Sequence, residues 1–180
     1  MKRAPKKKKA TTRDLVLAII DRDIAEVKRL HANGVSILEP DQYGWIPLHR
    51  AAVSNRAGIV RLLLKWGSPL EPEGNFGWTP LHLASISRSH RAIAVLLECG
   101  ANVNAQSESG CTPLHLVVGP TVTDSLLKSL RILLKAGADA NSANSKGETP
   151  LSKARTTGEP QLLQIFEEYK RKPKNSATRR

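Results

Sequence analysis

Aromatic residues, cysteines and long apolar runs are all scarce in this chain of 180 residues. Phe, Trp and Tyr make up only 4% of it, so the core must come mainly from Leu, Ile, Val and Ala, which favours helices packed on helices. Two cysteines do not make a disulfide framework, so we expect a reducing compartment. The chain is long enough for one ordinary domain.

No apolar stretch approaches the roughly 20 residues that a membrane span requires. The longest early run, Leu15 to Ile20, follows a basic start but has only six residues and is bracketed by Asp14 and Asp21. A secretory signal peptide needs a longer run and a small-residue cleavage site. We therefore expect a soluble protein inside the cell.

Acidic residues are missing from both ends of the chain. The first ten residues carry six of the 28 Lys and Arg, and residues 170–180 carry six more. The sixteen bases between them are balanced by all sixteen acids, so the net charge of +12 belongs to the two tails. A folded nucleic-acid reader usually has its basic patch on the domain itself. The neutral body argues against such a reader, while the tails remain candidates.

An internal repeat is the strongest positive feature of the sequence. Four related motifs start 33, 33 and 37 residues apart: Ile46-Pro47-Leu48-His49, Thr79-Pro80-Leu81-His82, Thr112-Pro113-Leu114-His115 and Thr149-Pro150-Leu151-Ser152. Glycines at 34, 67, 100 and 137, each closing a segment rich in apolar residues, keep the same spacing. Two independent markers therefore define one repeating unit.

Each unit has the signals of two short helices joined to the next unit by a turn. Thr is a good helix N-cap and Pro fits the first helical position. A second helix with apolar residues such as Ile93 and Leu96 then ends at a glycine, which takes the left-handed conformation easily. Turn glycines follow at 44, 77, 110 and 147, two residues before each motif. Neither helix can bury its apolar face alone, so the units must stack into a solenoid with one shared core.

These motifs resemble the ankyrin-repeat family, whose 33-residue unit is a β-turn and two antiparallel helices. Ala101-Asn102-Val103-Asn104-Ala105 and Ala138-Asp139-Ala140-Asn141 are similar to the segment that follows the second helix in that family. The resemblance implies an all-α solenoid of helix-turn-helix units with β-turn or hairpin fingers. It covers residues 11–170 as five units, 11–40, 41–73, 74–106, 107–143 and 144–170, between basic disordered tails 1–10 and 171–180.

The chain departs from the family pattern in four places. Ile46 stands where the family has its capping Thr, at a cost of about 1 kcal/mol. The fourth unit has four extra residues, which we place in a loop at 119–124 between its helices. The last unit has Ser152 in place of His and carries Pro160 near the start of its second helix. Terminal units of a solenoid are expected to be atypical, because one face meets water.

The repeated histidines suggest architecture rather than chemistry. The resemblance implies that His49, His82 and His115 hydrogen-bond neighbouring turns together, and we assign the same structural role to the capping residues Thr79, Thr112 and Thr149. Cys99, Cys111 and His115 lack the paired spacing of a zinc site. No phosphate-binding loop, nucleophile elbow or carboxylate pair is found in the sequence. We predict no metal, no cofactor and no enzymatic activity.

A protein partner is the expected ligand. The resemblance implies that finger tips and first helices line a concave groove, and large aromatic residues are common binding anchors. The candidate residues are Tyr43, Trp45, Phe76 and Trp78 around the turn glycines, and Arg50, Val53, Ser54, Ile86 and Ser87 on the first helices. Two alternatives stay open: the two tryptophans pack on each other, and Arg50 lies solvated along its helix.

The tails suggest a location and a second function. Lys2, Arg3, Lys6, Lys7, Lys8 and Lys9 resemble a nuclear import signal, with a solubilising tail as the plain alternative. Our first hypothesis is an adaptor, scaffold or stoichiometric inhibitor in the nucleus, with the cytoplasm as a second location, acting as a monomer or within a hetero-complex. The second is a nucleic-acid-associated regulatory protein whose tails bind RNA or DNA while the repeats recruit a partner.

Asn104 and Asn141 resemble asparagines that are hydroxylated in some ankyrin proteins, although a turn asparagine making local hydrogen bonds has the same sequence.

Overall fold

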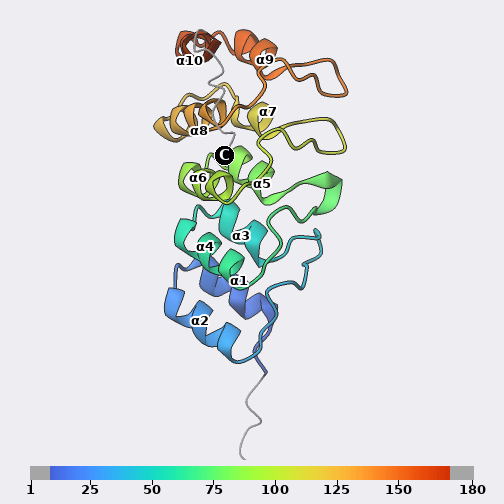
Figure 1. The fold of residues 1–180 in the computed structure, drawn as a ribbon, viewed down its shortest axis with the longest axis vertical. Helices are drawn as coiled ribbons and strands as arrows, with labels where there is room; N and C mark the ends of the chain where they lie inside the picture. The colour runs from blue at the N-terminus through green and yellow to red at the C-terminus, as the bar shows by residue number, and fades with distance from the viewer. Residues whose placement is uncertain (1–8, 171–180) are drawn as a thin grey trace, which may run out of the picture.

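The computed structural model describes residues 9–170, which form ten α-helices, one 3-10 turn and no strand (Figure 1). The helices come in consecutive pairs joined by short connections. The pairs are α1 (Thr12–Ile20) with α2 (Ile24–Ala32), α3 (Pro47–Val53) with α4 (Ala57–Lys65), α5 (Pro80–Ile86) with α6 (His90–Glu98), α7 (Pro113–Val117) with α8 (Asp124–Lys135), and α9 (Pro150–Thr157) with α10 (Pro160–Lys170). The 3-10 turn, η1, covers Asn75–Gly77.

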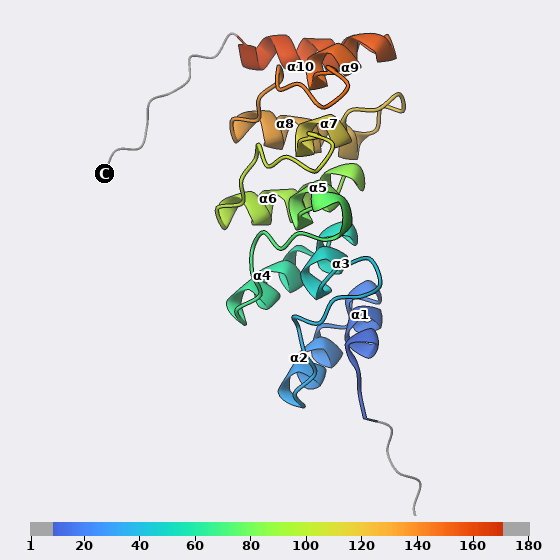
Figure 2. The ribbon, with the colours of Figure 1, turned by 90° about the vertical axis from the view of Figure 1, so that its right-hand side faces the viewer.

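The pairs stack along one axis in two rows (Figure 2). First helices pack on first helices from α1 through α3, α5 and α7 to α9, and second helices pack likewise from α4 through α6 and α8 to α10. Between pairs the chain runs out to one side and returns, on the right of Figure 1. We call these four excursions the first to fourth fingers, residues 34–45, 67–78, 100–111 and 137–148. The all-α repeat solenoid expected from the sequence is confirmed.

The helix ends follow the repeat signals. Proline occupies the first turn of α3, α5, α7 and α9, where no backbone N–H is needed. The Thr149 hydroxyl accepts a hydrogen bond from the Ser152 N–H at 3.0 Å, as an N-cap should. The glycines at 34, 67, 100 and 137 have φ between +80° and +95°, the left-handed conformation that ends the second helices.

The core is one continuous column of aliphatic side chains. Leu15, Leu48, Leu81 and Leu114 recur every 33 residues and are at most 1% exposed. In the described range, Phe166 is the one aromatic residue that is fully part of this core. The scarcity of aromatics thus fits a core that four stacked unit interfaces share, since each interface needs only Leu, Ile, Val and Ala. None of the helices described here is long and apolar enough to cross a membrane.

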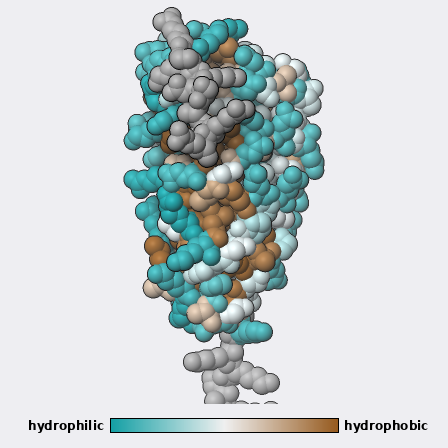
Figure 3. All heavy atoms as spheres, in the orientation of Figure 1, coloured by the Kyte–Doolittle hydropathy of each residue, from teal (hydrophilic) through white to brown (hydrophobic). Residues whose placement is uncertain are grey.

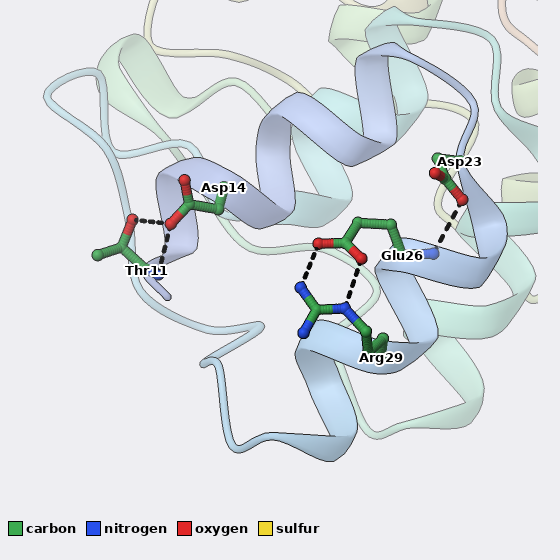
Figure 4. Close-up of polar contacts among 5 residues, drawn as sticks. All are labelled: Thr11, Asp14, Asp23, Glu26 and Arg29. Atoms are coloured by element: carbon green, nitrogen blue, oxygen red, sulfur yellow. Dashed lines mark hydrogen bonds and ion pairs between the residues drawn. The ribbon is translucent and has the colours of Figure 1, made fainter. Parts of the chain in front are cut away.

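The N-terminal unit begins with a capping arrangement of its own (Figure 4). The backbone N–H and the hydroxyl of Thr11 both donate to Asp14, at 2.8 and 2.9 Å. Asp23 caps α2 by accepting the Glu26 N–H at 2.9 Å, and Arg29 donates twice to Glu26, each time at 2.6 Å. A unit that lacks the Thr-Pro start therefore still has both helix starts satisfied.

The extra residues of the fourth unit form a loop between α7 and α8, as expected. The loop spans residues 118–123, because Asp124 is already the first residue of α8 and Thr123 caps it by accepting the Leu126 N–H at 3.1 Å. A Cβ on Gly119 would lie 2.7 Å from the Arg88 guanidinium. The loop therefore passes close to the Arg88 side chain of the preceding unit.

Candidate functional site

The four fingers are joined edge to edge by backbone hydrogen bonds. The Asn75 N–H donates to the Tyr43 carbonyl at 3.0 Å, and the Glu108 N–H donates to the Phe76 carbonyl at 3.0 Å. The Ser145 N–H donates to the Ser109 carbonyl at 2.9 Å in the same way. These bonds make the finger tips a continuous ridge whose side chains keep a fixed spacing.

Each repeated histidine ties its own helix start to the next finger. The Nδ1 atom of His82 accepts the Thr79 N–H at 3.2 Å, and its Nε2 atom lies 3.0 Å from the Cys111 carbonyl of the next unit. His49 reaches the Trp78 carbonyl at 3.1 Å and His115 reaches the Glu148 carbonyl at 3.0 Å. A backbone N–H can only donate, so Nδ1 must accept and Nε2 must carry the proton.

Burial keeps these rings neutral. Removal from water lowers the pKa of His49, His82 and His115 below its ordinary value, although the carbonyl acceptors act in the opposite direction. A neutral ring with its proton on Nε2 is the form that the two hydrogen bonds require. The three side chains are thus fully occupied in linking units.

The aromatic residues of the first finger form a cluster with Arg50. The Arg50 guanidinium lies 4.5 Å from the centroid of the Trp45 ring and 5.9 Å from that of Tyr43, and the two ring centroids are 5.5 Å apart. Arg50 also forms an ion pair with Asp41. Arg50 is therefore not a side chain lying free along its helix, because Asp41 and Trp45 hold its charged end.

Asp41 organises this cluster. Its carboxylate accepts the N–H groups of Tyr43 and Trp45 at 2.8 and 3.0 Å. Partial burial alone would raise the pKa of Asp41, but the Arg50 side chain and these two N–H groups outweigh it and hold the pKa below its usual value. The carboxylate stays ionised and keeps Arg50 over the Trp45 ring.

The two tryptophans do not pack on each other. Among the described residues no ring contact joins Trp45 to Trp78. A Cβ on Gly74 would lie 2.6 Å from Cδ1 of Trp45, so the Trp45 ring covers the start of the second finger turn at a point where only glycine fits. Both rings are half-buried, which leaves part of each accessible to a partner.

The residues at the first two tips are exposed. Phe76 is 69% exposed and Tyr43 is 47% exposed. Phe76 also has φ +66°, inside η1, a left-handed conformation that a bulky residue adopts only at a cost in free energy. Sequence reasoning placed Phe76 on the partner surface but did not predict this conformation. An exposed aromatic ring in a strained turn is a pattern that functional sites retain.

Apart from Arg50, the first-helix candidates lie at the far ends of their helices. Ile86 is 47% exposed and Ser87 is exposed at the end of α5, while Val53 and Ser54 are half-buried at the end of α3. The finger aromatics lie beside the starts of these helices. The structure therefore brings Tyr43, Trp45 and Arg50 into contact. The helix-end residues lie apart from this cluster, at the opposite ends of the first helices.

A cleft of about 870 Å³ lies between α1 and the first finger. Its lining includes Lys9, Arg13, Val16, Glu39, Trp45 and Arg50. Two residues of its lining, Thr12 and Glu39, are joined by a hydrogen bond of 2.7 Å that the Thr12 hydroxyl donates. Trp45 and Arg50 were predicted from the sequence, but the α1 side of the cleft was not. The first unit lacks the Pro-Leu-His motif, so its residues could not be aligned with those of the other units.

Other predicted residues have simpler surroundings. Within residues 9–170 no group of three or more His, Cys, Asp or Glu side chains could hold a metal ion. Asn104 Oδ1 accepts the Asp139 N–H at 2.8 Å, and its Nδ2 donates to the Gly137 carbonyl at 3.3 Å, so this asparagine joins the third finger to the fourth. Of the import-like run, Lys9 is exposed and the other basic residues lie outside the described range.

Comparison with protein families identifies the repeats. A family model described as ankyrin repeats in three copies matches residues 68–142, and one described as ankyrin repeats in many copies matches residues 15–64. No curated protein gives a significant match. The matched ranges hold the second to fourth helix pairs, the links made by His49 and His82, and the second and third fingers. The chain therefore belongs to the ankyrin-repeat family, whose repeats are protein-interaction modules.

Proposed function

We propose that this protein binds a protein partner along the side formed by its fingers and first helices, as an adaptor or stoichiometric inhibitor. The observation that carries the proposal is the pair of exposed aromatic tips, Tyr43 and Phe76, on adjacent fingers. Solvent-exposed aromatic residues of this size are common anchors in protein interfaces. Apolar surface exposed to water is unfavourable in free energy, and a bound partner would cover it.

The ridge is suited to binding because it is ordered before the partner arrives. The hydrogen bond from the Asn75 N–H to the Tyr43 carbonyl fixes the distance between the first and second tips. Trp45 is held by Tyr43, Arg50 and the close approach to Gly74. A preformed surface loses less conformational entropy on binding than a flexible one, so more of the contact energy contributes to affinity.

Partner capture tests this function. The double variant Tyr43→Ser, Phe76→Ser removes both exposed rings, and Ser109→Ala, Lys146→Ala changes the equivalent positions of the third and fourth fingers. We expect quantitative affinity capture to lose specific partners with the first variant and retain them with the second. Circular dichroism should give the same helix content for both. Full retention of every partner by the Tyr43, Phe76 variant would remove the basis of the proposal.

Nuclear location is proposed for the same protein on the basis of its two basic ends, residues 1–10 and 170–180, which hold twelve of the 28 Lys and Arg. The same charge supports the second candidate function, in which the tails bind RNA or DNA. A chain reduced to residues 9–170 separates the two. Loss of nuclear accumulation with unchanged partner capture supports an import role, and loss of salt-sensitive nucleic-acid binding supports the second function.

A further inference from the structure

The fingers are the acidic part of a basic protein. Seven of the sixteen acids lie in the four fingers, with a single base, which gives the fingers a net charge of −6. The acids are Glu39, Asp41, Glu71, Glu73, Glu108, Asp139 and Glu148, and the base is Lys146. The finger side is also mainly hydrophilic in colour, on the right of Figure 3. The helices and their short loops carry the compensating positive charge.

Most of this negative charge has no cation beside it. Asp41, paired with Arg50, is the one finger carboxylate in the described residues that forms an ion pair. Glu71 accepts only the Asn102 N–H, at 2.8 Å. Glu73 and Glu108 form no side-chain hydrogen bond or ion pair within the described range. The ridge therefore offers carboxylates that no cation of the described residues neutralises.

Two of these features lie side by side at the second and third tips. The Glu108 N–H donates to the Phe76 carbonyl, and a Cβ on Gly77 would lie 3.5 Å from Cγ of Glu108. The Glu108 side chain thus begins next to the backbone of the turn that carries Phe76, the most exposed aromatic residue of the described chain. A carboxylate and an aromatic face together bind a lysine or arginine side chain, through an ion pair and a cation–π contact.

The first finger already holds an arginine by this chemistry. Arg50 lies over Trp45 and pairs with Asp41. At the equivalent positions of the second finger, the chain has Trp78 but has Leu83 in place of Arg50 and Gly74 in place of Asp41. The second finger therefore keeps the aromatic rings without an internal cation, and Glu73 and Glu108 supply the negative charge nearby.

We propose that the acidic finger ridge binds a lysine- and arginine-rich segment of the partner protein, with one cationic side chain held between Phe76 and Glu108. This inference rests on the proposed function and names the partner's chemistry. The whole chain carries +12, so it repels basic peptides in general. Binding of such a segment must therefore be local to the ridge, which makes the test stringent.

The test uses the full chain and two labelled twelve-residue peptides, one of Lys, Arg, Gly and Ser and one with Glu in place of the basic residues. Fluorescence anisotropy should detect the basic peptide, with affinity that falls as salt rises. Glu73→Gln, Glu108→Gln should weaken it about fivefold or more, and Phe76→Ala by a similar factor. The matched control Glu98→Gln, Glu167→Gln removes two exposed carboxylates from the second helices and should change affinity less than about twofold.

Three results would overturn the inference. Equal weakening by the finger and control variants would mean non-specific attraction, and preference for the acidic peptide would reverse the assigned charge. Binding of the basic peptide only after residues 1–8 and 171–180 are removed would assign the ridge to the chain's own tails. None of these results affects partner capture by the Tyr43, Phe76 pair, so failure of this inference is distinguishable from failure of the proposed function.

Discussion

The first two fingers and the last two share a backbone but not a surface. All four are tight turns with a glycine at φ between +68° and +74°, joined by hydrogen bonds of 2.9 to 3.0 Å. Yet Tyr43 and Phe76 at the first two tips correspond to Ser109 and Lys146 at the last two. The motif residues set the geometry of every finger alike. Recognition must therefore depend on the residues that the motif leaves free.

The largest expected effect concerns what the fingers share. His82→Ala removes a buried ring and leaves the Thr79 N–H and the Cys111 carbonyl without their partner. We expect a loss of about 2–4 kcal/mol in the free energy of unfolding, measured by urea denaturation. His115→Ala should cost a similar amount, because its ring makes the same bonds.

Tip variants supply the contrast for this experiment. Tyr43→Ser should change the free energy of unfolding by less than about 0.5 kcal/mol, since the side chain is half exposed. If the tip and histidine variants lowered the free energy of unfolding by the same amount, it would be wrong to assign the histidines to the architecture and the tips to a free surface.

A pair of glycine substitutions compares the two ends of the ridge. Gly77 has φ +68° and a Cβ there would lie 3.1 Å from the Glu108 backbone nitrogen, whereas Gly147 has φ +74° and open space around it. Gly77→Ala should therefore cost about 2 kcal/mol and Gly147→Ala about 1 kcal/mol. Thermal and urea unfolding of the two variants measure the difference. Equal costs would show that the hydrogen bonds between neighbouring fingers do not constrain the second turn more than the last one.

Acid should weaken all of the histidine links together. The pKa of His49, His82 and His115 is lowered by burial, so below about pH 6.5 the unfolded chain binds protons that the folded chain does not. The free energy of unfolding should stay at its full value above pH 6.5. Below that pH it should fall by on the order of 1 kcal/mol per pH unit. Urea unfolding between pH 7 and 5.5 measures this. His82→Ala should have a shallower pH dependence, and an unchanged slope would contradict the assigned cause.

Periodic features could be predicted from the sequence, because each was present several times at nearly one spacing. The Pro-Leu-His motifs and the turn glycines define positions in the stack without knowledge of any contact, and the long fourth unit could be recognised because it departs from their spacing. The pairing of Asp41 with Arg50 could not be predicted in this way. It joins residues nine positions apart in one unit alone, and depends on how the finger folds back on α3.

The left-handed conformation of two arginines could not be predicted from the sequence either. Arg22, Asn55 and Arg88 have φ between +53° and +65° in the loops that join the helices of a pair. Glycine or asparagine predicts such a conformation, but arginine does not. Here the positions of the two flanking helices determine the turn, and the loop residue adopts the left-handed conformation despite its cost in free energy.

Phe76 allows the smallest and sharpest test of the comparison between fingers. Its φ of +66° is the only positive value for a non-glycine residue in any described finger. Asparagine tolerates this conformation far better than phenylalanine, so Phe76→Asn should raise the free energy of unfolding by about 0.5–1 kcal/mol while weakening partner binding. Paired urea unfolding and partner capture measure both, with Tyr43→Asn as the control that removes a ring where φ is already favourable.

If Phe76→Asn destabilised the fold, the ring would be a structural element of the second finger. A more stable protein that binds less well would mean that the ring is retained for recognition, at a site where the shared architecture alone favours another residue.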